Sequence, residues 1–308
     1  MTLIIVTRKA KKVSFSSDSR ISFGDNGYFD KGIKLFSVPM KLKKPLKSIK
    51  DVSKFEIERN FGIAVVGNSI NAYTIKDTIT ETLSNITYLS NLSEVSLPSL
   101  GLLVCDVHKE ISKELSFLGE NGLFELILGG YCLFEKRVRI LRVFYKIETE
   151  EIEYGFEEFL RDEKMAFYGS GKNYAQEIYN NDKTLEPLQI IKHVIKSKKC
   201  PKVGEALQYG DFYGKDFRIL GVNEIEFDEN GMLKNRMHFR RGSEVGKIED
   251  EIKKPPYLAV SYSYKQVNIK PEKNKLNVTR SPPNLPNFRP KMRVTLSHDM
   301  AVVSRCFQ

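Results

Sequence analysis

Apolar and polar residues alternate through much of the chain, with the period of two that is typical of β-strands. Residues 2–8 (TLIIVTR) and 13–17 (VSFSS) are rich in β-branched and apolar side chains, and the AKK between them predicts a hairpin turn. Similar runs predict further strands at 32–38, 61–67, 124–129, 137–146, 165–169, 203–209, 216–222 and 235–240, with a hairpin turn at DENG (228–231).

Four other segments have the period of helices, and we expect helices at 68–86, 100–118, 173–181 and 185–197. The clearest is 100–118, where apolar residues recur at steps of three and four: Leu100, Val104, Val107, Ile111, Leu115 and Leu118. The chain therefore runs strands, two helices, strands, two helices, strands. Such grouped blocks predict an α+β fold, a four-layer αββα sandwich of two stacked antiparallel sheets with helices outside.

The regular pattern ends near residue 243. KIEDEIKKPPYL is charged and contains Pro, and the last forty residues, with SPPNLPNFRPK, have no clear periodicity. We therefore expect one domain over 1–243 and a basic, Pro-containing extension over 244–308. A basic stretch, KLKKPLKSIK, predicts a linker over 39–60.

The composition adds few constraints. Of the 308 residues 41% are hydrophobic, enough for a sizeable core, and the net charge of +10 allows an acidic partner or nucleic acid. The basic cluster at 41–50 has no aromatic partner and no nucleic-acid-reading module is apparent, so nucleic acid is not the expected partner. No apolar run is long enough for a membrane span or a signal-peptide core, which favours a cytoplasmic protein.

Metal and disulfide chemistry are not indicated either. The four cysteines, Cys105, Cys132, Cys200 and Cys306, are scattered, and the four histidines do not sit near them in sequence. Four cysteines in a chain of this length do not form a disulfide scaffold. We expect no metal and no cofactor.

Thr2 is the first residue of interest, because methionine before a small residue is commonly removed. An N-terminal Thr carries both a hydroxyl nucleophile and its own base, an α-amine with a pKa near about 8. Such a nucleophile needs a nearby cation that favours the alkoxide-like state, and a buried cation needs an acid partner. Asp18 lies 18−2 = 16 positions on, and Lys34 lies 34−2 = 32 positions on, in strands predicted to pair beside the first.

These residues carry a resemblance. VSFSSDSRISFG followed by KGIKLFSV resembles the start of a proteasome β subunit or its bacterial HslV-type relatives, threonine peptidases of the N-terminal nucleophile hydrolase class. Thr2, Asp18 and Lys34 fall on the nucleophile, acid and lysine of that family without a gap. AVVGNSINAYTI resembles the family's glycine turn into its first helix, and FYGSGKNYA resembles the GSG segment that opens its third.

The resemblance, which spans roughly 2–240, implies further roles. Gly67 would supply an oxyanion-hole N–H, and Ser170 would lie near the amine. Ser22 and Ser69 would lend backbone groups to an extended substrate, and Val65 would line the pocket for the residue before the cut. It also implies a homo-oligomeric ring that hides the sites, perhaps fed by an ATP-dependent unfoldase. One departure is SKKCPKVGEAL, where the family usually has an acid and a serine.

The leading interpretation is therefore a proteasome-like threonine peptidase that acts on peptide or unfolded-protein substrates. A small-amide hydrolase of the same fold remains an alternative, and a peptide-library assay would separate the two. A non-catalytic structural subunit is another, which predicts the loss of Thr2, Asp18 or Lys34, and all three are present. A nucleic-acid-binding protein would instead show a steep salt dependence of DNA binding.

Overall fold

The structure is a computed structural model that divides into two compact units, Met1–Pro271 and Glu272–Gln308. The residues that it describes all belong to the first unit: 2–23, 27–45, 55–67, 69–88, 95–115, 123–148, 151–161, 164–241, 243–244 and 263–269. The last forty residues, for which the sequence predicts an extension, lie almost entirely outside the described residues.

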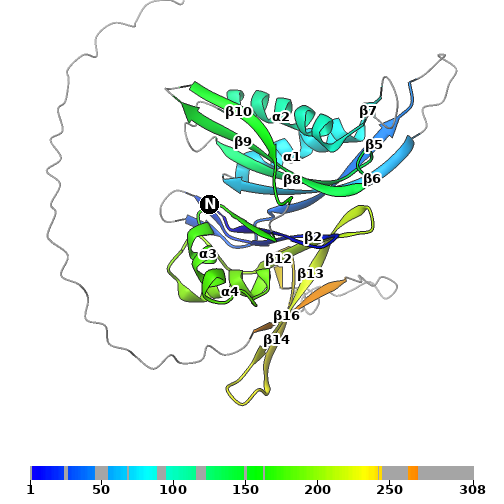
Figure 1. The fold of residues 1–308 in the computed structure, drawn as a ribbon. Coiled ribbons are helices and arrows are strands. Elements are labelled where there is room, and N and C mark those ends of the chain that lie inside the picture. The colour runs from blue at the N-terminus through cyan, green and yellow to red at the C-terminus, as the bar shows by residue number, and fades with distance from the viewer. Residues whose placement is uncertain are drawn as a thin grey trace, which may run out of the picture. The chain divides into compact units, whose positions relative to one another are not determined.

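The described residues form an α+β fold, as the order of predicted elements indicated, with four helices and mainly antiparallel sheets (Figure 1). The helices are α1 (Ser69–Ser84), α2 (Leu97–Glu114), α3 (Lys172–Asn181) and α4 (Pro187–Ser197). The strands are β1 (Ile4–Lys9), β2 (Lys12–Asp18), β3 (Ile21–Phe23), β4 (Gly27–Phe29), β5 (Leu35–Lys43), β6 (Phe55–Gly67), β7 (Ile86–Thr87), β8 (Phe124–Cys132), β9 (Arg137–Glu148), β10 (Glu151–Glu158), β11 (Met165–Tyr168), β12 (Leu207–Tyr213), β13 (Asp216–Phe227), β14 (Leu233–Arg240), β15 (Ser243–Glu244) and β16 (Tyr264–Ile269).

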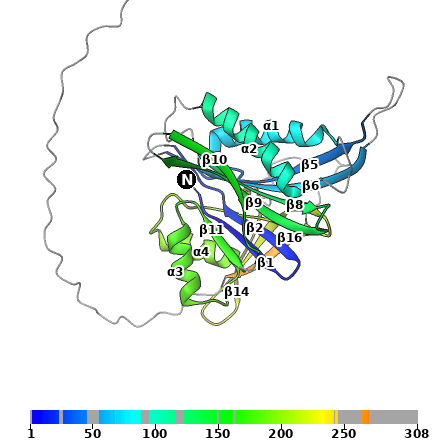
Figure 2. The same ribbon diagram turned by 45° about the horizontal axis from the view of Figure 1, so that its top comes forward.

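Two large sheets organise the fold. A six-stranded sheet has the order β10-β9-β8-β6-β5-β7, and an eight-stranded sheet has the order β11-β1-β2-β12-β13-β14-β15, with β16 joined to β13. Helices α1 and α2 lie against the six-stranded sheet, whereas α3 and α4 lie on the side of the eight-stranded sheet (Figures 1 and 2). A separate two-stranded sheet joins β3 to β4.

Three hydrophobic clusters correspond to this arrangement. One joins α1 and α2 to β5, β6 and β8, a second joins α3 and α4 to β1 and β12, and the third contains residues of both large sheets. The position of β1 between two clusters explains why its sequence is continuously apolar. Leu3 and Ile5 pack into the helix-side cluster, while Ile4 and Val6 pack into the cluster shared by the two sheets, so both faces of β1 are buried.

Most predicted elements are confirmed, but the linker predicted at 39–60 is wrong at both ends, and its middle, 46–54, lies outside the described residues. Strand β5 continues to Lys43 and β6 begins at Phe55, and the two pair in register from Leu35↔Ala64 to Lys43↔Phe55. Alternating burial along 38–43 favours this pairing: Val38, Met40 and Leu42 are buried, whereas the alternate residues Pro39, Lys41 and Lys43 are only partly buried. The many lysines of this stretch led to the prediction of a linker, although its apolar residues alternate as they do in a strand.

Six of the strands in the described part of the chain were not predicted, β3, β4, β7, β10, β15 and β16, and one was misplaced. Strand β10 has many glutamates, and β16 lies within the stretch assigned to the extension, yet it pairs in parallel with β13. The strand predicted at 203–209 begins instead at Leu207 and runs to Tyr213, because the preceding loop turns to reach the start of β3. Helix α2 begins three residues earlier than predicted, where Ser96 and Ser99 form a capping box.

None of the helices in the described part of the chain is long and apolar enough to cross a membrane.

Phe217 is the side chain that best tests the packing between the two large sheets. Its ring centroid lies 5.2 Å from those of both Phe15 and Phe212. A Cβ on Gly62, in the other sheet, would come within 2.7 Å of this ring, so the glycine makes room for it. We expect Phe217→Ala to lower the free energy of unfolding by about 3–5 kcal/mol, measured by urea denaturation.

The matched control is Phe134→Ala, because that ring is 66% exposed. We expect its effect to stay within about 0.5 kcal/mol. Equal losses in the two variants would contradict the packing described for Phe217.

Candidate active site

Three strands bring the predicted nucleophile, acid and lysine together. Thr2 lies just before β1, Asp18 ends β2 and Lys34 immediately precedes β5. Because β1 and β2 pair with Ile4 opposite Ser17, the start of one strand lies beside the end of the other. A residue 16 positions away in sequence is thereby adjacent to Thr2 in space.

A single carboxylate oxygen joins the three side chains. The Thr2 hydroxyl donates to Asp18 Oδ1 at 3.5 Å, and Lys34 Nζ donates to the same oxygen at 2.8 Å. All three residues are buried, with exposed fractions of 1%, 0% and 3% for Thr2, Asp18 and Lys34. The ammonium and the hydroxyl therefore share a partner in a site that excludes water, where electrostatic interactions are strong.

Backbone N–H groups fix the orientation of the Asp18 carboxylate. Leu3 N donates to Oδ1 at 2.8 Å, and Arg20 N and Gly204 N donate to Oδ2 at 3.1 and 3.2 Å. Charge-assisted hydrogen bonds of this kind satisfy a buried carboxylate that a lysine alone would leave partly unpaired. The carboxylate is thus held in place independently of Thr2 and Lys34.

Burial is the main influence on Lys34. Desolvation lowers the pKa of its ammonium, and the charge and hydrogen bond of Asp18 oppose that shift without cancelling it. Lys34 therefore loses its proton more readily than a lysine in water, while Asp18 still stabilises the charged form.

Gln208 on β12 positions the loop that carries Lys34, and the sequence analysis missed it. Its Oε1 accepts hydrogen bonds from the N–H groups of Lys34, at 3.0 Å, and Leu35, at 3.4 Å. Its Nε2 donates to Gly32 O at 2.5 Å. One polar residue in a buried strand was its only sequence signal, and its partners lie more than 170 positions away.

A cavity of about 380 Å³ opens beside Thr2 and is lined by Gly67 and Ser170 as well. The Ser170 hydroxyl donates to the carbonyl of Thr2 at 3.5 Å, and Gly171 N donates to the same carbonyl at 3.4 Å. Thus Ser170 lies beside Thr2, as predicted, although the contact is with its carbonyl. Other lining residues are Val66, Leu123, Phe124, Glu125, Arg142, Tyr145, Phe167, Tyr168, Gly169 and Lys172.

Two glycines allow the chain to approach itself around this cavity. Gly169 has a φ of +89°, and a Cβ there would stand 2.1 Å from the carbonyl oxygen of Thr2. Gly67 ends β6 with a φ of +116°, and a Cβ there would lie 3.0 Å from the Cα of Phe124. A side chain at either position would displace the backbone beside Thr2.

Of the residues predicted to bind substrate, Ser22 and Val65 are not among the described residues that line this cavity. Ser22 lies on β3 and its hydroxyl is buried with no hydrogen-bond partner in the described part of the chain. Val65 lies on β6 with its side chain in the cluster beneath α1 and α2, and its N–H donates to Lys34 O at 3.1 Å. Ser69 is the first residue of α1.

The segment that departs from the family pattern also reaches the site. Cys200 is buried, and its sulfur lies 4.0 Å from the carbonyl oxygen of Ser170. Four residues on, Gly204 supplies one of the N–H groups that hold Asp18. The described residues contain no cluster of His, Cys, Asp and Glu side chains that could hold a metal ion.

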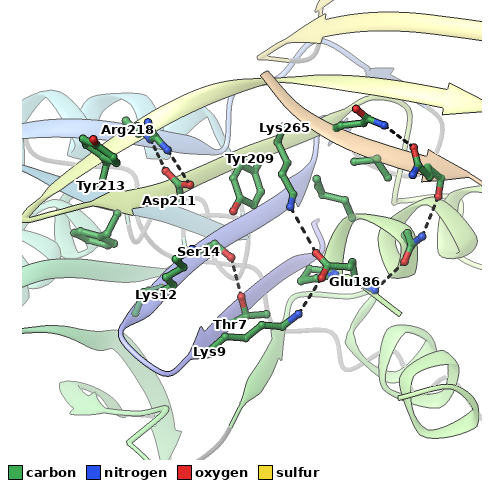
Figure 3. A pocket seen from close by; sticks show the side chains of 18 residues that line it. Thr7, Lys9, Lys12, Ser14, Glu186, Tyr209, Asp211, Tyr213, Arg218 and Lys265 are labelled. Carbon is green, nitrogen blue, oxygen red and sulfur yellow. Dashed lines mark hydrogen bonds and ion pairs between the residues drawn. The ribbon is translucent and has the colours of Figure 1, made fainter. Parts of the chain in front are cut away.

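A larger cavity, of about 550 Å³, lies at the other end of β1 and β2 (Figure 3). Its charged side chains mostly pair with one another: Glu186 contacts Lys9 at 2.9 Å and Lys265 at 3.7 Å, and Asp211 contacts Arg218 at 2.6 Å. Both carboxylates of the cavity are thus held in ion pairs, while Lys9, Lys12, Arg218 and Lys265 leave its described lining with an excess of positive charge.

Comparison with known proteins adds only weak likenesses. No protein-family model and no curated protein matches the chain. Among solved structures it is similar to Anbu (ancestral beta-subunit) from Yersinia bercovieri, with 18% identity, a TM-score of 0.48 and coverage of 70% of this chain and 86% of that one. It is also similar to the Gly-1 mutant of Anbu from Hyphomicrobium sp. strain MC1, with 16% identity, a TM-score of 0.48 and coverage of 78% and 88%.

A further similar structure is Thiobacillus denitrificans BPH, with 14% identity, a TM-score of 0.42 and coverage of 68% of this chain and 97% of that one. Likenesses this weak carry no argument about activity. The chain's own geometry therefore has to support any assignment.

The buried ion pair can be tested by a double-mutant cycle. Asp18→Asn leaves the Lys34 ammonium buried without an acid, and we expect it to lower the free energy of unfolding by about 3–5 kcal/mol. Asp18→Asn with Lys34→Met removes both charges and should recover part of that loss. Chemical denaturation of the two single variants, Asp18→Asn and Lys34→Met, and of the double variant measures the coupling.

Asp211→Asn is the control, because the pair of Asp211 with Arg218 is partly exposed. Its expected cost is about 0–1 kcal/mol. A double variant no more stable than Asp18→Asn would show that the ion pair does not hold the site together.

Proposed function

We propose that the chain is an N-terminal nucleophile hydrolase of the threonine type that cleaves peptide bonds, and that its layers form the four-layer αββα sandwich of that class. The observation that carries the proposal is the shared carboxylate: the Thr2 hydroxyl and the Lys34 ammonium both donate to Asp18 Oδ1 beside a cavity. A hydroxyl on the second residue gains a base of its own once Met1 is removed.

The first step would be acylation. The α-amine of Thr2 accepts the proton of the hydroxyl, directly or through a water, while the oxygen attacks the carbonyl carbon of the substrate. The Lys34 ammonium favours the developing negative charge on the oxygen and lowers the pKa of the amine, which keeps the amine neutral and basic. The tetrahedral intermediate then collapses, the leaving amine takes the proton, and an ester joins the substrate acyl group to Thr2.

The second step would be hydrolysis of that ester by water, with the same amine as base. In both steps the carbonyl oxygen of the substrate becomes negative, and the N–H of Gly67 is proposed to donate to it. Gly67 supports this role because it lines the same cavity as Thr2. Ser170, next to Thr2, would help to position the amine or the bridging water.

Substrate binding is proposed to follow the resemblance. An extended peptide would bind as an added strand along backbone groups near Ser22 and Ser69. Val65 would line the pocket for the side chain of the substrate residue that precedes the cleaved bond. We also infer a cytoplasmic, homo-oligomeric assembly that restricts access to the sites, with an unfoldase as a possible partner class. A small amide is the second candidate substrate, because a cavity of about 380 Å³ lies within the range of small-molecule sites.

The N-terminus provides the direct test. We expect intact-mass measurement and N-terminal sequencing to show a chain that begins at Thr2, because only then does the amine exist. A peptide epoxyketone, which needs both a hydroxyl and a free amine, should label this chain, and Thr2→Ala should abolish the labelling.

Thr2→Ser is the matched control for the labelling test, since it keeps a hydroxyl and should keep the reaction. A retained Met1, or labelling that survives Thr2→Ala, would contradict the proposal. Cleavage of a peptide library by the labelling-competent chain would favour peptides over small amides.

The pH dependence follows from the lowered pKa of Lys34. The acid limb of the pH profile of kcat/KM reports protonation of the Thr2 amine. Its apparent pKa should lie below about 8, because the Lys34 ammonium lowers the pKa of that amine. The alkaline limb reports loss of the Lys34 proton. Its apparent pKa should lie below the pKa of about 10.4 that lysine has in water, because burial lowers the pKa of Lys34.

The arginine in Lys34→Arg keeps its charge at high pH. We therefore expect this substitution to shift the alkaline limb to higher pH, even if it lowers the rate. An alkaline limb that this substitution leaves in place would show that another group controls it.

A further inference from the structure

The cavity of about 550 Å³ lies where the eight-stranded sheet extends past the start of α4 (Figure 3). Alternate residues of β1 and of the residue before it share one face of that sheet. On this face Leu3 and Ile5 pack into the cluster of α3 and α4, whereas Thr7 and Lys9 line the cavity. Helix α4 begins at Pro187, which also lines the cavity, so the polar end of the sheet face is left open beside the helix.

The described lining of this cavity carries two more positive than negative charges. Its four cations and two carboxylates are those of Lys9, Lys12, Arg218, Lys265, Glu186 and Asp211. Arg218 and Asp211 pair one to one. Lys9 and Lys265 share the single carboxylate of Glu186, and Lys12 has no carboxylate partner among the described residues. The surplus of positive charge therefore belongs to the lysines.

The hairpin of β1 and β2 places two of these lysines directly opposite each other. Lys9 and Lys12 are cross-strand partners at its closed end, and Thr7 and Ser14 form the next pair on the same face. Like charges in directly opposite positions of a sheet are destabilising. A negative group bound between the two ammonium groups would offset that repulsion, which is a second indication that the cavity takes an anion.

Glu186 shows that this end of the cavity stabilises a negative group. Lys9 Nζ lies 2.9 Å from one oxygen of its carboxylate, and Lys265 Nζ lies 3.7 Å from the other. The hydrogen bond from Lys9 is the main cause that lowers the pKa of Glu186. An ammonium has three N–H donors, so Lys9 can contact Glu186 and a ligand together.

We propose that this cavity binds a small organic monophosphate with an aromatic body, and that the phosphate group lies between Lys9 and Lys12. A phosphomonoester carries a charge of about −1.5 to −2 at pH 7 and has three acceptor oxygens. Because the two lysines lie at one end of the cavity, a single compact dianion matches them better than a dicarboxylate, whose two charges lie apart. The hydroxyls of Thr7 and Ser14 are 2.7 Å apart, and the pair keeps one O–H to donate to the phosphate.

The rest of the cavity indicates the body of the ligand. A volume of about 550 Å³ is far more than a phosphate group needs and lies within the range of small-molecule sites. Tyr209 and Tyr213 give the lining two aromatic rings. Tyr213 is 73% exposed, and the guanidinium of Arg218 lies 4.7 Å from the centroid of its ring. An aromatic ligand would stack on such a ring and cover it.

Isothermal titration calorimetry on the full-length chain tests the proposal. The probes are AMP, UMP, flavin mononucleotide and phenyl phosphate, each measured beside its dephosphorylated form and beside inorganic phosphate. We expect at least one probe to bind with a Kd below about 100 μM, and at least about tenfold more tightly than its dephosphorylated form or inorganic phosphate. Lys12→Ala should weaken this binding by about tenfold, because it removes a charge-assisted contact with the phosphate.

Lys11→Ala is the matched control, because Lys11 is an exposed lysine in the turn of the same hairpin and is not among the described residues that line the cavity. This variant should bind the probe as the unmodified chain does. Thr2→Ala should bind it equally well, since the described linings of the two cavities share no residue. Failure of this proposal is thereby distinguishable from failure of the proposed hydrolase.

Three results would overturn the assignment of this cavity: no binding of any of the four phosphates, equal losses in Lys11→Ala and Lys12→Ala, or loss of binding in Thr2→Ala. Inorganic phosphate that binds as tightly as the organic compounds would overturn the aromatic ligand.

Discussion

The Asp18 carboxylate is the group on which the rest of the site depends. It is fully buried, and it gathers an ammonium, a hydroxyl and three backbone N–H groups from segments that are far apart in the sequence. These donors take the place of the water that burial removes, whereas the loss of a charged partner would leave a charge that the interior cannot solvate. The acid therefore fixes the spacing between Thr2 and Lys34 as well as their electrostatics.

Well-packed strands and loops surround this carboxylate. Strand β1 is buried on both faces, between helix-side and sheet-side clusters, so the residue that precedes it has little freedom to move. Gly169 and Gly171 close over Thr2 from the turn that opens α3, and Gln208 holds the loop of Lys34 from β12. The side chains of Thr2, Asp18 and Lys34 are thus held in one arrangement by the surrounding fold.

Local patterns predicted most of the elements. Continuous or alternating apolar runs were enough for β1 and β2, and helical spacing was enough for α4. Asp18 lies beside Thr2 because β1 and β2 pair in register. Lys34 precedes β5, a strand of the other large sheet, so its place beside Asp18 followed from the resemblance and not from local strand pairing. The predictions were wrong where charge masked a strand, as in β5 beyond Val38, and missed β10. Gln208 and Gly204 could not be found, since their roles are set by contacts across the whole chain and leave no local pattern.

The distance along the chain between these groups has a consequence for synthesis. The nucleophile emerges from the ribosome first, but Gly204 and Gln208, which hold Asp18 and the Lys34 loop, emerge about two hundred residues later, after more than ten seconds at typical translation rates. Until β12 docks beside β2, the lysine loop lacks its anchor and the acid lacks one of its donors. A nascent chain therefore lacks the complete set of contacts around Thr2, Asp18 and Lys34, which forms only when the domain closes.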